Sequence, residues 1–135
     1  MAVLTITASN VVIVSSSSNV IQQYTAGAAI NAGQLFYVDT SNLAQISVNS
    51  SELAAGVIGI AMNTAEAANQ PLQGLLKGTI TIGTGTVGSG YYLSSTSGSL
   101  ELESDQSSSD WVTFAGIITS TGVLEFQPLL SGAQR

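Results

Sequence analysis

The sequence predicts an all-β fold: a compact antiparallel barrel or sandwich of about ten short strands, with an internal duplication and minimal helix. Apolar and polar residues alternate in several short runs, of which Thr-Ile-Thr-Ile at residues 79–82 is the clearest, and this period of two is typical of a half-buried strand. Turn-forming residues separate such runs at intervals of about 8 to 12 residues, as in sandwiches and barrels. The third observation is a repeated pattern of glycine, tyrosine and aliphatic residues.

The stretch GTITIGTGTVGSGYYL, residues 78–93, is the part of the chain around which the others are organised. Its first half is the alternating strand, and glycines at positions 83, 85, 88 and 90 follow it. Glycine adopts positive φ without steric cost, so these residues allow a sharp turn before the apolar Tyr-Tyr-Leu at residues 91–93. We therefore expect a strand, a tight turn and a second strand.

The second half of this stretch has an earlier counterpart in AGQLFYVDTSNLAQI, residues 32–46. Matching residues are separated first by 55 positions and then, after two extra residues in the later copy, by 57. The matches are Gly33 with Gly88, Tyr37 with Tyr92, Val38 with Leu93, Leu43 with Leu100, Gly59 with Gly116, Ile60 with Ile117, and Thr64 with Thr121. Because their order is kept throughout, the sequence predicts a duplicated β unit.

The N-terminal segment is set apart from the rest by a run of serines. We divide the chain into an N-terminal strand or extended arm at residues 1–19 and a single β domain at residues 20–135. Two apolar runs, at residues 3–7 and 11–14, precede Ser15–Ser18 and Asn19, which form a polar break. Either the two runs are strands of the main sheet or they form an arm that moves independently, and the sequence leaves both interpretations open.

The composition excludes several classes of function. Hydrophobic residues make up 44% of the chain and charged residues only 7%, so small and hydroxyl side chains cover much of the surface. Two basic residues against eight acidic ones give a net charge of −6. Such a charge repels phosphate backbones and anionic lipid headgroups, so we expect neither nucleic acid nor membrane as a partner.

Residues suited to catalysis are nearly absent. The chain has no histidine and no cysteine, which removes the usual general base, the thiolate nucleophile and the ordinary zinc ligands. Four acids cluster at Glu101, Glu103, Asp105 and Asp110, but their spacing is not that of an EF-hand. Leucine and glutamate alternate at residues 100–103, which predicts a solvated acidic face. We therefore expect no enzyme activity, no catalytic residue, no cofactor and no metal site.

Two further patterns invite a binding function. Gly83, Gly85 and Gly88 match the letters of a dinucleotide fingerprint, yet strand-forming residues follow them where that fingerprint requires a helix. Trp111, with Tyr91 and Tyr92, could form a sugar-stacking platform, although such aromatic residues are more often core or subunit contacts. A carbohydrate-binding adhesin or fibre module is thus the alternative interpretation of the chain.

Several segments together resemble a known family. They are LTITASNVV, AGAAINAGQLFYVD, GVIGIAMNTAEAANQPLQGLLKGTITIG, YYLSSTSGSL and WVTFAGIITST, which cover nearly the whole chain in this order. In this combination the chain resembles the small head decoration, or cement, proteins of tailed bacteriophages. The resemblance implies an all-β protein, generally a homotrimer, that sits on the outer surface of the capsid of the virion, after synthesis in the host cytoplasm, and braces neighbouring copies of the major capsid protein.

The resemblance and the low charge lead to two hypotheses about contacts. A surface with few long charged side chains loses little entropy and desolvates few ions on association, so it suits permanent symmetric contacts. We expect the N-terminal segment to contact the capsid through Val3, Leu4, Ile6, Val12 and Val14. We expect the subunit interface to use Leu35, Tyr37, Tyr91 and Leu93.

Overall fold

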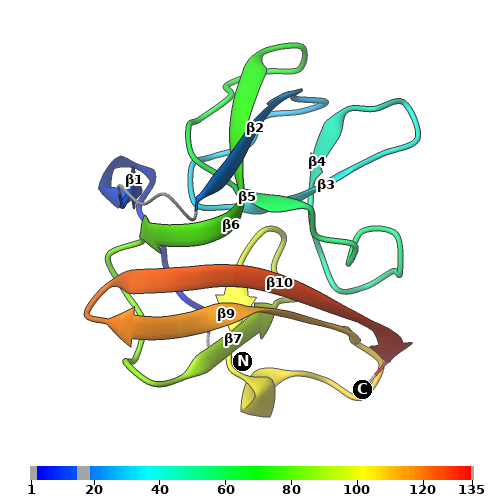
Figure 1. Cartoon of the computed structure of the whole chain (residues 1–135). Coiled ribbons are helices and arrows are strands. Elements are labelled where there is room, and N and C mark those ends of the chain that lie inside the picture. The colour runs from blue at the N-terminus through cyan, green and yellow to red at the C-terminus, as the bar shows by residue number, and fades with distance from the viewer. Residues whose placement is uncertain (1–2, 15–18, 135) are drawn as a thin grey trace.

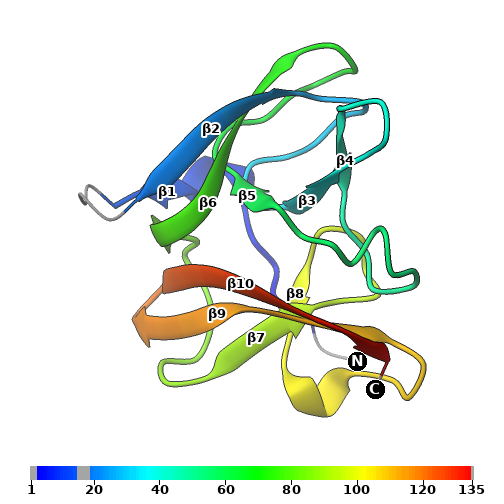
Figure 2. The same cartoon turned by 45° about the vertical axis from the view of Figure 1, so that its right-hand side comes forward.

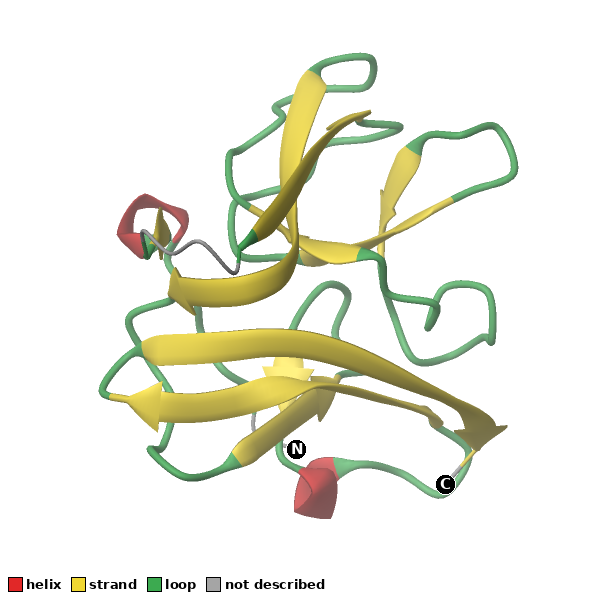
Figure 3. Ribbon diagram, in the orientation of Figure 1, coloured by secondary structure: helices red, strands yellow, loops and turns green. Residues whose placement is uncertain are grey.

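The computed structural model describes residues 3–14 and 19–134 of the chain, and β-strands dominate this part. The only helices in it are two 3-10 turns, η1 (Ala8–Asn10) and η2 (Glu103–Asp105) (Figure 3). No helix within the described ranges has the length and apolarity needed to cross a membrane. The all-β fold predicted from the sequence is therefore confirmed.

Ten strands follow one another along the described residues. They are β1 (Val12–Ile13), β2 (Val20–Thr25), β3 (Leu35–Val38), β4 (Ala44–Ile46), β5 (Gly59–Ala61), β6 (Pro71–Thr81), β7 (Gly90–Leu93), β8 (Leu100–Glu101), β9 (Trp111–Ser120) and β10 (Val123–Gln134). All strand pairs are antiparallel and belong to one strongly curled sheet (Figure 1).

The strand order is β4-β3-β5-β6-β10-β9-β7-β8, in which each half of the chain forms the same four-strand pattern. The long strand β6 belongs to both halves. Its first part pairs with β5, as in Ile60 opposite Leu75, and its last residues pair with β10, as in Leu124 opposite Ile80. Figure 2 shows the two halves as separate curls above and below, with β6 passing between them.

The N-terminal segment closes each half into a barrel-like ring. In the first half, β2 pairs with β6, and Ala26 at the end of β2 bridges to Ala44 on β4. In the second half, β1 pairs with the end of β6, while Val3 bridges to Glu101 on β8. Residues 3–14 and 19–26 therefore add strands to the main sheet, which is one of the two interpretations that the sequence left open.

The register of the strands agrees with the predicted duplication. In the first copy Leu35 faces Ile60 and Phe36 faces Gly59; in the second, Gly90 faces Ile117 and Tyr91 faces Gly116. These pairs are related by the same separations of 55 and 57 residues that the sequence shows. The duplicated residues therefore occupy equivalent places in the two halves.

The duplicated glycines let the strands approach closely. A Cβ atom at Gly59 would lie 2.8 Å from the carbonyl oxygen of Leu75 on β6, nearer than a side chain tolerates. A Cβ atom at Gly116 would collide in the same way with the carbonyl oxygen of Glu125 on β10. Glycine is required at both places for the same reason: the backbone of the next strand occupies the space.

Another glycine marks the place where the N-terminal segment crosses β6. Gly78 has φ of +141° and lies under Asn19, whose Cα atom would be 2.9 Å from a Cβ at this position. The amide of Asn19 accepts a hydrogen bond from the Thr79 backbone N–H at 2.9 Å and donates one to the Val14 carbonyl at 2.6 Å. Asn19 thereby joins the segment to β6.

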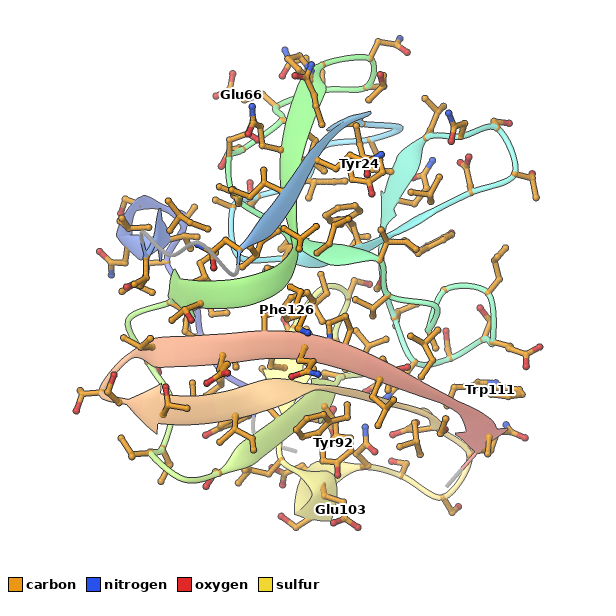
Figure 4. The ribbon with its side chains drawn as sticks, viewed as in Figure 1. Tyr24, Glu66, Tyr92, Glu103, Trp111 and Phe126 are labelled. Carbon is orange, nitrogen blue, oxygen red and sulfur yellow. The ribbon has the colours of Figure 1, made fainter. Side chains whose placement is uncertain are left out.

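Two clusters of buried apolar side chains form the core. The smaller fills the ring of the first half and includes Ile30, Phe36 and Leu72. The larger lies within the second half and between the halves, where Phe126 is fully buried (Figure 4). Ile80 and Ile82 belong to it, which confirms the inward face predicted for residues 79–82.

The prediction of a solvated acidic face at residues 100–103 is wrong for one of its two glutamates. Glu103 is exposed on η2, but Glu101 is fully buried. The alternation is real, since Leu100 points into the core, but Asp105 and Asp110 of the following loop lie near Glu101 on the other face, and Val3 pairs with Glu101 at the strand edge. A period of two reports which side chains share a face, not what covers that face.

Candidate assembly surfaces

One exposed apolar surface lies on the second half of the molecule. β10 pairs with β6 only as far as Phe126, and its remaining residues run on beside β9 alone. On this extension Leu129 is 68% and Leu130 is 50% exposed, and Ile117 on β9 is 44% exposed. We call this surface the β9–β10 face, and it comprises Tyr92, Val112, Phe114, Ile117, Leu129 and Leu130.

The β9–β10 face is shaped by aromatic rings. Tyr92 and Phe114 pack edge to face, with ring centroids 5.3 Å apart and planes at 72°. Together with Val112 and the two leucines of β10 they line an open, shallow apolar depression. Glu125 and Gln127 border the neighbouring part of the face, so polar groups lie at the rim. An apolar centre with a polar rim is the usual organisation of a protein–protein contact surface.

A second exposed apolar surface follows the N-terminal segment along β6. Val12 on β1 is 58% exposed, and Val20 and Ile21 on β2 are 49% and 45% exposed. All three pair with β6: Val12 lies opposite Thr81, Val20 opposite Lys77, and Ile21 opposite Leu75. We call these three residues the arm surface.

The predicted capsid-contact residues are divided between core and surface. Leu4 and Ile6 are half-buried against the larger core cluster, and Val3 forms the bridge to β8. The backbone N–H of Val14 donates to the Thr79 carbonyl at 3.2 Å, which fixes this residue to β6. Val12 has the most exposed side chain of the five.

Three of the four predicted subunit-interface residues belong to the core. Leu35 and Leu93 are fully buried, and Tyr91 is 3% exposed, with its hydroxyl accepting a hydrogen bond from the Thr86 backbone N–H at 3.0 Å. Side chains enclosed in this way have no surface left for a partner, so this part of the hypothesis is corrected. Tyr37 alone of the four remains partly exposed.

The aromatic residues considered for sugar stacking do not form a common platform. Tyr91 is in the core, Tyr92 packs on Phe114, and Trp111 lies half-buried against the core at the far end of β9 (Figure 4). A sugar-binding platform needs an aromatic face that is open to the ligand. The structure therefore gives the adhesin interpretation no specific support.

The acidic cluster is also divided by burial. Burial of Glu101 raises the pKa of its carboxyl group, and Asp110 and Asp105 raise it further, while the side chain of Ser94 and the backbone N–H of Ser95 act in the opposite direction. Asp110 is nearly buried and accepts a hydrogen bond from the Ser107 backbone N–H at 2.7 Å. Within residues 3–14 and 19–134, no three acidic side chains converge as metal ligands.

Comparison of the chain with protein-family models, with curated proteins and with solved structures finds no significant match.

Proposed function

We propose that the protein is a structural virion protein that binds the outer surface of a phage capsid as a cement or decoration protein and stabilises contacts between major capsid protein subunits. The observation that supports this most is the pair of exposed apolar surfaces on a chain with so few charged groups. A brace must hold at least two neighbours at once, and two separate surfaces meet that requirement.

The two surfaces suit different contacts. The β9–β10 face is the larger and holds two aromatic rings and two leucines, as interfaces between permanently associated subunits do. We assign it to the contact between copies of the chain in a homotrimer. The arm surface is smaller and made of aliphatic side chains on strands that the fold holds in place, and we assign it to the capsid.

The charge distribution supports a protein partner. Lys77 is exposed on β6, whereas exposed acids are spread over both halves, as at Glu66 and Glu103 (Figure 4). With a net charge of −6, the molecule attracts a basic protein surface and repels nucleic acid. Because few charged side chains surround the apolar contact, little free energy is spent on removing water from charged groups when the partner binds.

Two pairs of substitutions test the assignments separately. Leu129→Asp with Leu130→Asp places charges at the centre of the β9–β10 face and should convert the trimer to monomers in light scattering. Val12→Asp with Ile21→Asp should leave the trimer intact but abolish co-sedimentation with shells assembled from the cognate major capsid protein. Both pairs lie on exposed positions, so the fold should tolerate them.

Ala68→Asp is the control, since it adds a charge at an exposed position of the loop between β5 and β6, outside both surfaces. It should retain both the trimer and shell binding. A wild-type protein that is monomeric at all concentrations would contradict the assignment of the β9–β10 face. A trimeric wild type that stays in the supernatant at saturating shell concentration would contradict capsid binding.

A further inference from the structure

Beneath the loop that follows β8, the structure buries a carboxylate and two side-chain amides. The amide oxygens Oδ1 of Asn49 and Oε1 of Gln106 receive no hydrogen bond, while the side chain of Ser94 and the backbone N–H of Ser95 approach the carboxylate of Glu101. Asn49 and Glu101 are fully buried and Gln106 is 8% exposed. An amide oxygen of this kind loses its contacts with water on folding, and without a new partner it destabilises the fold.

The end of β7 brings these side chains together. The amide nitrogens of Asn49 and Gln106 both donate to the carbonyl oxygen of Leu93, at 3.1 and 2.9 Å. The next residue, Ser94, faces the carboxylate of Glu101. Three side chains from different parts of the chain thus converge around two consecutive residues of the β7 end.

The hydrogen bonds to Leu93 fix the direction of both amides. Exchanging the oxygen and nitrogen of either amide would place two acceptor oxygens in contact at the Leu93 carbonyl, which is repulsive. Both amide oxygens must therefore point away from that carbonyl. The cluster offers a metal ion two amide oxygens and a carboxylate, with the carboxylates of Asp110 and Asp105 near enough to act on Glu101.

The charge of Glu101 has no basic side chain beside it among the described residues. Lys77 is the only base in that part of the chain, and it is exposed on β6. A buried carboxylate without a counter-charge is strongly unfavourable, which is why burial raises the pKa of Glu101, and a positive charge beside it favours the charged form. A metal cation supplies that charge and accepts electron pairs from carboxylate and amide oxygens alike.

We propose that this cluster binds Ca²⁺, with the carboxylate of Glu101 and the amide oxygens of Asn49 and Gln106 as ligands and Asp110 as a nearby negative charge. Ca²⁺ takes six to eight oxygen ligands in flexible geometry, including amide oxygens and water, whereas Mg²⁺ demands a regular octahedron of shorter bonds. With few carboxylates the affinity should resemble that of weak extracellular modules, about 0.1–1 mM. The bound ion would join the loop after β4, the end of β7 and the loop after η2.

Thermal unfolding of the full chain tests the proposal, with each protein measured in EDTA and in millimolar CaCl2 at equal ionic strength. The wild type should unfold at a higher temperature in CaCl2, and MgCl2 or NaCl should have a smaller effect. Glu101→Gln should remove the Ca²⁺-dependent shift, and Gln106→Leu should reduce it. The shift is compared within each variant, because Glu101→Gln removes a buried charge and so changes the unfolding temperature by itself.

Glu66→Gln is the charge-matched control, since it removes an exposed acid remote from the cluster and should keep the full shift. Luminescence of Tb³⁺ gives a second readout that needs no variant. Trp111, whose backbone N–H donates to the Asn49 carbonyl at 2.9 Å, is the residue that we expect to sensitise a bound Tb³⁺, and Ca²⁺ should displace the Tb³⁺. A wild type whose unfolding temperature responds equally to CaCl2 and NaCl, or Tb³⁺ luminescence retained in Glu101→Gln, would overturn the proposal.

Discussion

Asp39 holds the turn between β3 and β4 through its carboxylate. Oδ1 accepts hydrogen bonds from the backbone N–H groups of Ser41 and Leu43 at 2.9 and 3.0 Å, and Oδ2 accepts one from the Gln45 amide at 2.9 Å. The bond from Gln45, and then those from the backbone, hold the pKa of Asp39 below its ordinary value of 3.8. These bonds favour the charged carboxylate, and Asn42, with φ of +65°, completes the turn.

The lowered pKa predicts how stability depends on pH. The charged form is favoured in the folded state, so the contribution of Asp39 is complete above pH 3.8 and is lost as the pH falls through the lower folded pKa. Asp39→Asn removes the charge. The difference in unfolding free energy between wild type and variant, measured by urea denaturation, should be constant above this value and shrink below it. A difference that does not change down to pH 2 would contradict this role.

At the level of strands, the duplicated glycines make the sharpest prediction. Gly59→Ala and Gly116→Ala each force a Cβ atom against a backbone carbonyl of the next strand, which cannot move away without breaking strand pairing. Overpacking of this kind should lower the unfolding free energy by about 1–3 kcal/mol in both variants. Thr119→Ala, on an exposed position of β9, should change it by less than about 0.5 kcal/mol. Equal stability of all three would contradict the close approach seen at both glycines.

The sequence predicted which face of a strand points inward better than it predicted how long the strand is. Alternation identified the inward face of residues 79–82, and the same alternation runs through β10, where Leu124 and Phe126 are buried and Glu125 and Gln127 are exposed. It could not reveal that β10 outruns β6, because strand length relative to a neighbour is set by the whole sheet. One signal was present: Gln70-Pro71-Leu72 recurs as Gln127-Pro128-Leu129, 57 residues later, and continues the duplication into β10.

The site residues were harder to predict than the fold. Leu35, Tyr91 and Leu93 were expected at the interface because they lie on aliphatic strands next to glycines, but buried core strands have the same pattern. Burial of Glu101 could not be predicted either, because it depends on the pairing of Glu101 with Val3, which is distant in sequence, and on the fold of the loop that follows β8. Local patterns specify faces, and long-range contacts decide which faces meet solvent.

At the scale of the whole molecule, the N-terminal segment has a structural role that changes how its capsid contact is tested. Residues 3–14 and 19–26 contribute to both rings, through Val3 at β8 and Ala26 at β4, so truncation would open the fold as well as remove a contact. Substitutions at Val12 and Ile21 leave the backbone pairing in place. They therefore separate loss of a contact from loss of structure.

Electron cryo-microscopy of cognate capsid shells incubated with the purified protein tests the central proposal most directly. We expect density for three copies around a common axis on the outer surface, with the β9–β10 faces of neighbouring copies in contact and Val12 against the shell. Shells that carry no added density at saturating protein, or density in which both apolar surfaces face solvent, would contradict the account.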